Sequence, residues 1–571
     1  MNTKKWLAVG TCVSMLGLFS ACSDDEGSNP ATPPTPVPES SSDNGSISSG
    51  NDLTSSSDVT VSSSSTAKPD QSSSSTNPED VIVDPGTTYM GVSEIMYNAP
   101  GGSTLEWVEV YIKSGPDLTD MLANNLRLDG AVSFSFPAGE LKKGQYVIVT
   151  NDVAEFKKTY PEASKNCKIY GPWDKDSKTN AIAKLSNEGD VVDVKLKGEG
   201  DVSAAFSNLP PWPSLANGNG HSLVYRGSGN EADPTSWGAS AVENGSPCAG
   251  GDKVIGDATV RLNEIKPFVL NESDGWIELY NYGSDPVDVS GWELESKQKK
   301  KTWTIGGSKT VVPAKGYLLL DATEAVFGDG LYLSDNGDEI YLYETAGGKH
   351  TGKESSLMLF AGKQSSGIVD LASGSTAQGS MVKETPAAAN STLKAGPIFI
   401  SEIHYHENPE DLNDVEFLEL VNKGTEDVTL VESVNNTPQG WKVEGINMEF
   451  SASDIIKAGG KMVLFSDSLK TKEALLRARF SIDESVPVRF YAGKLSNRGE
   501  TVAVKKPYSS APRSDGSTQW YYELSDATLY SDRWSGMSET DGKGKSLNRK
   551  DFTTMGYEYT MWEALAPTPG K

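Results

Sequence analysis

A pair of short polar–apolar segments recurs three times along the chain and sets the limits on its fold. The three copies are residues 92–97 with 106–111, residues 262–265 with 275–281, and residues 400–405 with 416–422. Within each half, polar and apolar residues alternate, which predicts a half-buried β-strand. The loops between the halves are rich in Gly, Pro, Asp and Asn, as expected of turns. A repeat of this length predicts an array of related β modules.

The length and charge of the chain restrict the classes of protein to consider. With 571 residues, the chain can form three or four domains that each bury a core. Its formal net charge is −27. Nucleic-acid-binding proteins normally present a basic face, so this balance argues against a nucleic-acid partner.

The first 21 residues predict a secretory signal. Lys4 and Lys5 precede an apolar run at residues 6–19, which is too short to span a membrane, and small residues lead to Cys22. Residues 19–22 (Phe-Ser-Ala-Cys) resemble a bacterial lipobox, which implies lipidation of Cys22. Residues 23–26 (Ser-Asp-Asp-Glu) resemble the acidic surface-export tag of some Gram-negative lipoproteins. We therefore expect an outer-membrane lipoprotein, exposed at the cell surface and attached by lipid alone. The alternative is an ordinary signal peptide cleaved nearby.

Residues 22–88 predict a disordered linker. Serine runs alternate with Pro, Asp and Thr, and few large apolar residues are available for packing. The segment carries eleven acidic residues against one lysine, Lys68, so we expect it to be extended as well as flexible.

Beyond the linker, the same short sequence motifs recur in the same order. They place the first module at residues 89–251, the second at 257–392 and the third at 396–571. Residues 355–390 lack the Ser-Leu ending of the other two modules, so the end of the second module is interpreted as degenerate. Helical character is expected only at residues 467–479.

The recurring motifs, taken in their order, resemble those of the lamin tail domain in its bacterial extracellular form. They are Glu-Ile near the start, Trp276-Ile277-Glu278-Leu279, Gly-Trp at 291–292, Leu-Ser-x-x-Gly-Asp at 333–338, and a closing Ser-Leu, Trp and Thr-Pro-Gly at 546–570. The resemblance covers nearly all of residues 89–571 and implies immunoglobulin-like sandwiches. Short alternating strands with frequent turn signals independently favour a sandwich or barrel. The expected fold is all-β: three tandem immunoglobulin-like (lamin-tail-like) β-sandwiches after a disordered Ser-rich linker.

The repeated residues have a structural interpretation. Trp107, Trp276 and Phe417 are expected to be core or core-edge aromatics, with Glu109, Glu278 and Glu419 on the opposite strand face. The alternative is that Glu94 and Glu109, and their counterparts, converge on a cation. No Asp-x-Asp-x-Asp-Gly loop supports calcium binding.

The search for catalytic and metal motifs finds little. The chain has four histidines and no nucleophile elbow, zinc-protease helix or nucleotide fingerprint. Glu402, His404 and His406 have ligand spacing, because alternate residues of a strand share a face, and they are the weak candidates for zinc. The alternative is a plain polar strand face. No cofactor is expected.

Two cysteines remain after Cys12 in the signal and Cys22 at its end. Cys167 and Cys248 both lie in the first module, and an exported protein meets an oxidising compartment. They predict a disulfide that closes a loop of some 80 residues; the alternative is two free thiols.

Aromatic residues in loop-like segments are the candidates for ligand binding. Trp173, Trp212 and Trp520 could present flat rings for stacking on sugars or peptides. For Trp212 the alternative is a cap folded over its own sandwich, and for Trp520 it is a place within a strand. The loops at 98–102, 268–274 and 406–414, where the three copies disagree, are the other place for a specific ligand.

Together these observations predict a non-catalytic, surface-anchored lipoprotein for adhesion, scaffolding or binding of an extracellular polymer. Its expected partners are the membrane, through the lipid, and an extracellular polysaccharide or protein. The alternative is a secreted hydrolase that acts on a polysaccharide or phosphoester at an unrecognised site.

Overall fold

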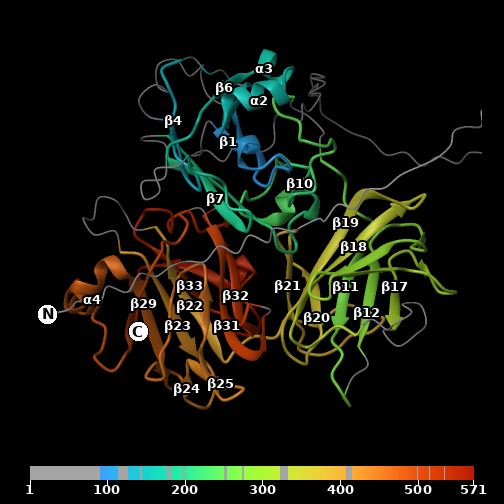
Figure 1. The fold of residues 1–571 in the computed structure, drawn as a ribbon. Helices are drawn as coiled ribbons and strands as arrows, with labels where there is room; N and C mark the ends of the chain where they lie inside the picture. The colour runs from blue at the N-terminus through green and yellow to red at the C-terminus, as the bar shows by residue number, and fades with distance from the viewer. Residues whose placement is uncertain are drawn as a thin grey trace, which may run out of the picture. The chain divides into compact units, whose positions relative to one another are not determined.

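A computed structural model describes residues 90–112, 126–139, 141, 144–175, 182–196, 200–249, 254–272, 275–321, 332–406, 415–497, 499–513, 515–532 and 534–571. The chain divides into two units, Met1–Ser75 and Thr76–Lys571, and every described residue lies in the second. The signal, the lipobox and the linker lie outside the described residues. Strands dominate the described chain, so the fold is all-β (Figure 1). None of the helices in these ranges has the length and apolar character needed to cross a membrane.

The first module contains two sheets. One has the order β10-β9-β1-β2-β5-β6 and the other β4-β3-β7-β8. Their strands are β1 (Met90–Met96), β2 (Trp107–Ile112), β3 (Leu126–Gly130), β4 (Phe134–Ser135), β5 (Tyr146–Thr150), β6 (Lys168–Tyr170), β7 (Gly189–Leu196), β8 (Gly200–Ser207), β9 (Leu223–Tyr225) and β10 (Trp237–Ala239).

The second module repeats this plan with sheets of order β17-β12-β11-β20-β21 and β15-β14-β18-β19, and a short pair β13-β16. The strands are β11 (Val260–Lys266), β12 (Trp276–Asn281), β13 (Val287–Asp288), β14 (Glu293–Ser296), β15 (Lys301–Thr304), β16 (Val311–Val312), β17 (Tyr317–Asp321), β18 (Asp338–Ala346), β19 (Lys349–Leu359), β20 (Ser366–Asp370) and β21 (Thr376–Ser380).

The third module has sheets of order β30-β29-β23-β22-β33-β34 and β27-β31-β32, with short pairs β24-β28 and β25-β26. The strands are β22 (Ile398–His404), β23 (Phe417–Asn422), β24 (Val428–Thr429), β25 (Val431–Val434), β26 (Thr437–Gly440), β27 (Lys442–Glu444), β28 (Ile455–Ile456), β29 (Lys461–Ser466), β30 (Val488–Tyr491), β31 (Gly499–Pro512), β32 (Thr518–Ser531), β33 (Ser546–Arg549) and β34 (Trp562–Leu565).

Each repeated sequence pair forms the antiparallel centre of its module's larger sheet. β1 pairs with β2, β11 with β12, and β22 with β23. One face of each pair is apolar; in the first module, Val108 and Val110 are completely buried with Leu128 and Val192 of the other sheet. The alternation seen in the sequence therefore buries one face of each larger sheet against the smaller sheet.

In the first and third modules, helices cover the opposite face of the larger sheet. The expected helix at 467–479 is confirmed as η6 (Asp467–Lys472) and α4 (Glu473–Phe480). The expectation of no other helix is wrong, because α2 (Val153–Thr159) and α3 (Ala163–Asn166) occur in the first module. The Asp152 side chain caps α2 by accepting from the N–H groups of Ala154 and Glu155 at 2.9 and 3.0 Å. Short 3-10 turns are η2 (Ser103–Leu105), η3 (Ser214–Ala216), η4 (Pro234–Ser236) and η7 (Tyr559–Met561).

Trp107 and Glu109 share the helix-covered face of β2, so their expected placement on opposite faces is wrong. Residues two apart on a strand point the same way. Trp107 packs under α2 against Phe156, with ring centroids 6.1 Å apart. Phe417 packs in the same way against Phe480 of α4. These aromatics form a second apolar layer outside the sheet.

The second module contacts both of the others. The Ser214 N–H and hydroxyl of the first module donate to the Glu354 carboxylate. On its other side, Met381 and Leu393 pack against Ala527 and Met555 of the third module. The hydroxyl of Tyr508 adds a hydrogen bond of 2.7 Å to Asp335.

Candidate functional site

A β-bulge precedes the first repeated glutamate in every module. The strand register shifts between Val92 and Glu94, between Leu262 and Glu264, and between Ile400 and Glu402. A bulge sets two residues against one, so consecutive side chains can reach the same face. In the third module the extra residue is Ser401, and its hydroxyl donates to Glu419 at 2.6 Å. Ser93 and Asn263 make the equivalent contacts to Glu109 and Glu278.

The first glutamate of each pair binds a Ser or Thr near the end of its module. In the third module, Thr568 donates to Glu402 through its N–H at 2.8 Å and its hydroxyl at 3.1 Å. The Ser546 hydroxyl is a further donor to the same carboxylate. The equivalent donors are Ser246 and Ser222 to Glu94, and Thr385 and Ser365 to Glu264.

The second glutamate binds the backbone two residues further on. The Gly570 N–H donates to Glu419 at 2.6 Å, and the Cys248 and Ala387 N–H groups donate to Glu109 and Glu278. The residue between the two donors is a proline, which has no N–H to leave unpaired. All three donors at the last position have positive φ, 63° for Cys248, 58° for Ala387 and 81° for Gly570. We call residues 246–248, 385–387 and 568–570 the clasp segments.

The glutamate pairs are therefore structural groups that hold the clasp segments. Protein donors surround the carboxylates that a cation would need, which argues against the alternative of a cation site. The clasp segment at residues 385–387 is the closing segment of the second module, whose end was expected to be degenerate. β20 pairs with β11 as β33 pairs with β22, and Thr385-Pro386-Ala387 occupies the place of Thr568-Pro569-Gly570. The Ser/Thr-Pro-x pattern was the signal that could have identified it.

The weak zinc candidates do not share one strand face. The prediction is wrong because β22 ends at His404, so His406 lies beyond the strand. Glu402 belongs to the clasp, His404 packs beside the Phe417 ring, and His406 contacts Asp541 at 2.8 Å. Burial lowers the pKa of His404 to about 4. Over the described ranges, no three His, Cys, Asp or Glu side chains are grouped as metal ligands.

The disulfide between Cys167 and Cys248 is confirmed. Their Cα atoms lie 5.8 Å apart, and 81 positions separate them in sequence. Cys248 is also the last residue of the first clasp segment. The bridge thus joins this segment covalently to the end of α3.

The three candidate tryptophans lie in different surroundings. The expected exposure is wrong for Trp173, which is 1% exposed and donates its Nε1–H to the Ala183 carbonyl. It is also wrong for Trp212, which is 8% exposed and packs near Trp237, as the capping alternative proposed. Trp520 is half-buried on β32, opposite Ser510 of β31. Of the variable loops, residues 273–274 and 407–414 lie outside the described ranges.

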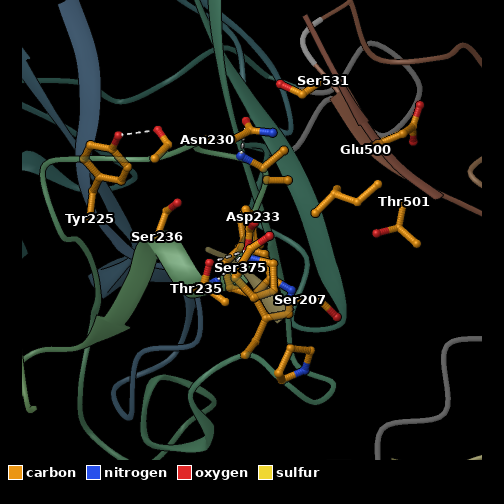
Figure 2. Close-up of a pocket in the computed structure, with 18 of the residues that line it drawn as sticks. Ser207, Tyr225, Asn230, Asp233, Thr235, Ser236, Ser375, Glu500, Thr501 and Ser531 are labelled. Atoms are coloured by element: carbon orange, nitrogen blue, oxygen red, sulfur yellow. Dashed lines mark hydrogen bonds between the residues drawn. The ribbon is translucent and has the colours of Figure 1, made fainter. Parts of the chain in front are cut away.

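A large cleft lies where the three modules meet. Its volume is about 1970 Å³, and its walls come from the first module, from the β20–β21 turn of the second, and from β31, β32 and η7 of the third. Figure 2 draws Glu500 and Thr501 of β31 on one wall and Ser207, Thr235 and Ser236 of the first module on another. None of these wall residues was a candidate from the sequence, although Glu500 lies in a repeated motif that the sequence interpreted as a turn.

Among the cleft wall residues, Glu500 has a strongly raised pKa. Its pKa is raised to about 8, chiefly by burial and also by nearby Glu416, while hydrogen-bond donors oppose the rise. Those donors are the Ser496 N–H at 2.6 Å and the Tyr530 hydroxyl at 3.1 Å. Asp190 and Asp338 occupy the position of Glu500 in the repeated Leu-Ser-x-x-Gly-Asp/Glu motif, and burial raises the pKa of each. This acid is therefore a repeated structural group of the modules.

We expect Glu500 to make the third module less stable as pH rises. Its folded pKa of about 8 exceeds the ordinary value of 4.5, so its stabilising contribution is full below pH 4.5 and is lost up to about pH 8. Glu500→Gln should remove at least about 1 kcal/mol of this decline, since one pKa unit corresponds to about 1.4 kcal/mol. Urea unfolding at pH 5 and pH 8 measures it, with exposed Glu484→Gln as the control. Equal declines in the wild type and Glu500→Gln would contradict the assignment.

Part of the chain matches a known protein family. Residues 256–353 match the Lamin Tail Domain family. A solved structure of a DUF4876 family protein from Bacteroides thetaiotaomicron is similar, with 9% sequence identity and a TM-score of 0.19. The similarity covers 50% of this chain and 90% of that chain. No curated protein matches the chain.

Proposed function

We propose that this chain, in which residues 256–353 match the Lamin Tail Domain family, is a non-catalytic surface lipoprotein that binds an extracellular polymer. In this proposal, the three modules are tandem lamin-tail-like sandwiches with immunoglobulin-like architecture. The lipid at Cys22 anchors them, and residues 23–88 hold them away from the membrane. The repeated strand pairs and clasps of the first and third modules support extending the family match to them.

The single observation that carries the binding proposal is the cleft at the junction of the modules. Concave surfaces at domain junctions are preferred places for ligands. The contacts of the second module with its two neighbours keep the walls together, so the ligand would meet a preformed surface.

The carboxylates of the cleft support binding more than hydrolysis. Hydrolysis of a glycoside needs an acid and a base free to act on the bond. Glu94 and Glu109 are engaged by the clasp, and Glu444 forms an ion pair of 2.7 Å with Lys505. The acids that line the cleft are thus largely committed to the fold.

Binding of the mature chain to a panel of polymers tests the proposed function. A Cys22→Ser form should be retained by at least one insoluble polysaccharide or extracellular protein, without releasing soluble products. Thr501→Trp, which fills the cleft from an exposed position of β31, should weaken retention at least tenfold. Thr518→Trp, exposed at the tip of the same hairpin and outside the cleft, is the matched control. No retention by any polymer, or turnover of a bound one, would contradict the proposal.

A further inference from the structure

The cleft is too large for a single small molecule. Small-molecule sites usually enclose about 300–1,000 Å³, whereas this cleft encloses about 1970 Å³. Three modules contribute wall residues that are far apart in sequence, among them Thr235, Ser375 and Thr501. These dimensions fit a segment of a longer chain that contacts several modules at once.

Most charged side chains of the walls already have partners within the protein. Lys505 pairs with Glu444 at 2.7 Å, and Arg226 pairs with Asp257. The Asp233 carboxylate accepts from the N–H and hydroxyl of Thr235 at 2.8 and 2.7 Å. A charged ligand would have to compete with these internal contacts, which lowers its net gain.

Hydroxyl groups and aromatic rings make up much of the remaining wall. Thr501, Ser535 and Ser538 of the third module are exposed there, as are Thr235 of the first module and Ser373 of the second. The rings of Tyr225, Trp534 and Tyr559 are half-buried along the same surface. Hydroxyls can both donate to and accept from the hydroxyls of a sugar. Aromatic rings offer an apolar face and a polar edge, which suits the apolar face of a pyranose.

The net negative charge of the protein disfavours the binding of polyanions. The net charge of −27 repels polymers of uronic acids or nucleotides at moderate ionic strength. Only two cationic side chains, Arg226 and Lys505, are among the described lining residues, and both are paired. An anionic polymer therefore has no free cation to bind among these residues.

Resting on the proposed function, we infer that the cleft binds an internal segment of an uncharged, hydroxyl-rich polysaccharide. The rings of Tyr225, Trp534 and Tyr559 provide stacking surfaces, and the wall hydroxyls provide hydrogen bonds. Neutral glycans satisfy both kinds of group without breaking the ion pairs of the walls.

Affinity electrophoresis of the Cys22→Ser chain in soluble polysaccharides tests this inference. The neutral probes are mixed-linkage β-glucan and xyloglucan, and the anionic probes are polygalacturonate and alginate. At least one neutral probe should retard the wild type, and Thr501→Trp and Tyr559→Ala should each weaken this at least tenfold. Thr518→Trp should leave the affinity unchanged. Circular dichroism melting of each variant establishes that it is folded.

Each remaining outcome overturns the inference in a distinguishable way. Binding of an anionic polysaccharide or a protein that Thr501→Trp abolishes leaves the proposed function intact and refutes the neutral ligand. Binding of a neutral probe that survives both cleft variants refutes the cleft as its site. Absence of binding to every polysaccharide and protein refutes the proposed function as well.

Discussion

Replacing both clasp glutamates of the third module, Glu402→Ala with Glu419→Ala, should lower its free energy of unfolding by at least about 4 kcal/mol. The change leaves the Thr568 and Gly570 N–H groups and the Ser546 hydroxyl without acceptors. The Ser401 and Thr568 hydroxyls keep only longer bonds, of 3.2 Å to the carbonyl of residue 419 and of 3.3 Å to Asn548. A buried donor without an acceptor costs about 1–3 kcal/mol. Lys461 also loses an ion pair of 2.9 Å with Glu419. The unfolding transition of this module in urea measures the effect.

Two controls separate the clasp from a general change in charge. Glu402→Gln with Glu419→Gln keeps an acceptor oxygen at each position and should cost clearly less. Glu426→Ala with Glu484→Ala removes two exposed carboxylates and should stay within about 0.5 kcal/mol. Amide exchange of the Gly570 N–H should become fast only in the first variant. Unchanged protection of Gly570 there would show that the carboxylates do not hold the segment.

Loss of the disulfide should destabilise the first module nearly as much. Cys167→Ser with Cys248→Ser opens a loop closed across 81 positions, for which chain entropy predicts about 4 kcal/mol. The third module is an internal control, since Gly570 occupies the clasp position of Cys248 without a bridge. Only the first-module transition should shift, and the same shift should follow reduction of the wild type. Coincident transitions before and after reduction would contradict this expectation.

The period of the sequence was enough to predict the β class and the centre of each larger sheet. The alternating segments at 92–97 and 106–111 became β1 and β2, and their counterparts became the matching pairs. The family match at residues 256–353 confirms the lamin-tail resemblance for the second module. The helix at 467–479 was visible because it is long enough to show a helical composition. The shorter α2 was not visible, because seven residues and one capping aspartate leave little periodicity.

Side-chain partners and the cleft could not be predicted in the same way. A cation site stayed open as the alternative for the glutamate pairs because the sequence does not show that Thr568 and Gly570 lie beside Glu402 and Glu419, roughly 150 positions away. Trp173 looked exposed because its neighbours are loop residues, yet the loop folds back over the core. Glu94, Glu109 and Trp212 line the cleft and were noted in the sequence, but no local pattern shows that they meet the Ser, Thr and Tyr residues of the other modules.

The affinity of the Cys22→Ser chain for the two neutral probes, mixed-linkage β-glucan and xyloglucan, tests the binding role of the cleft most directly. The measurement compares the wild type, Thr501→Trp and the control Thr518→Trp under one salt condition. We expect saturable binding by the wild type and the control, and at least tenfold weaker binding by Thr501→Trp. Equal affinity of all three proteins, or no binding by any of them, would contradict a polysaccharide site in the cleft.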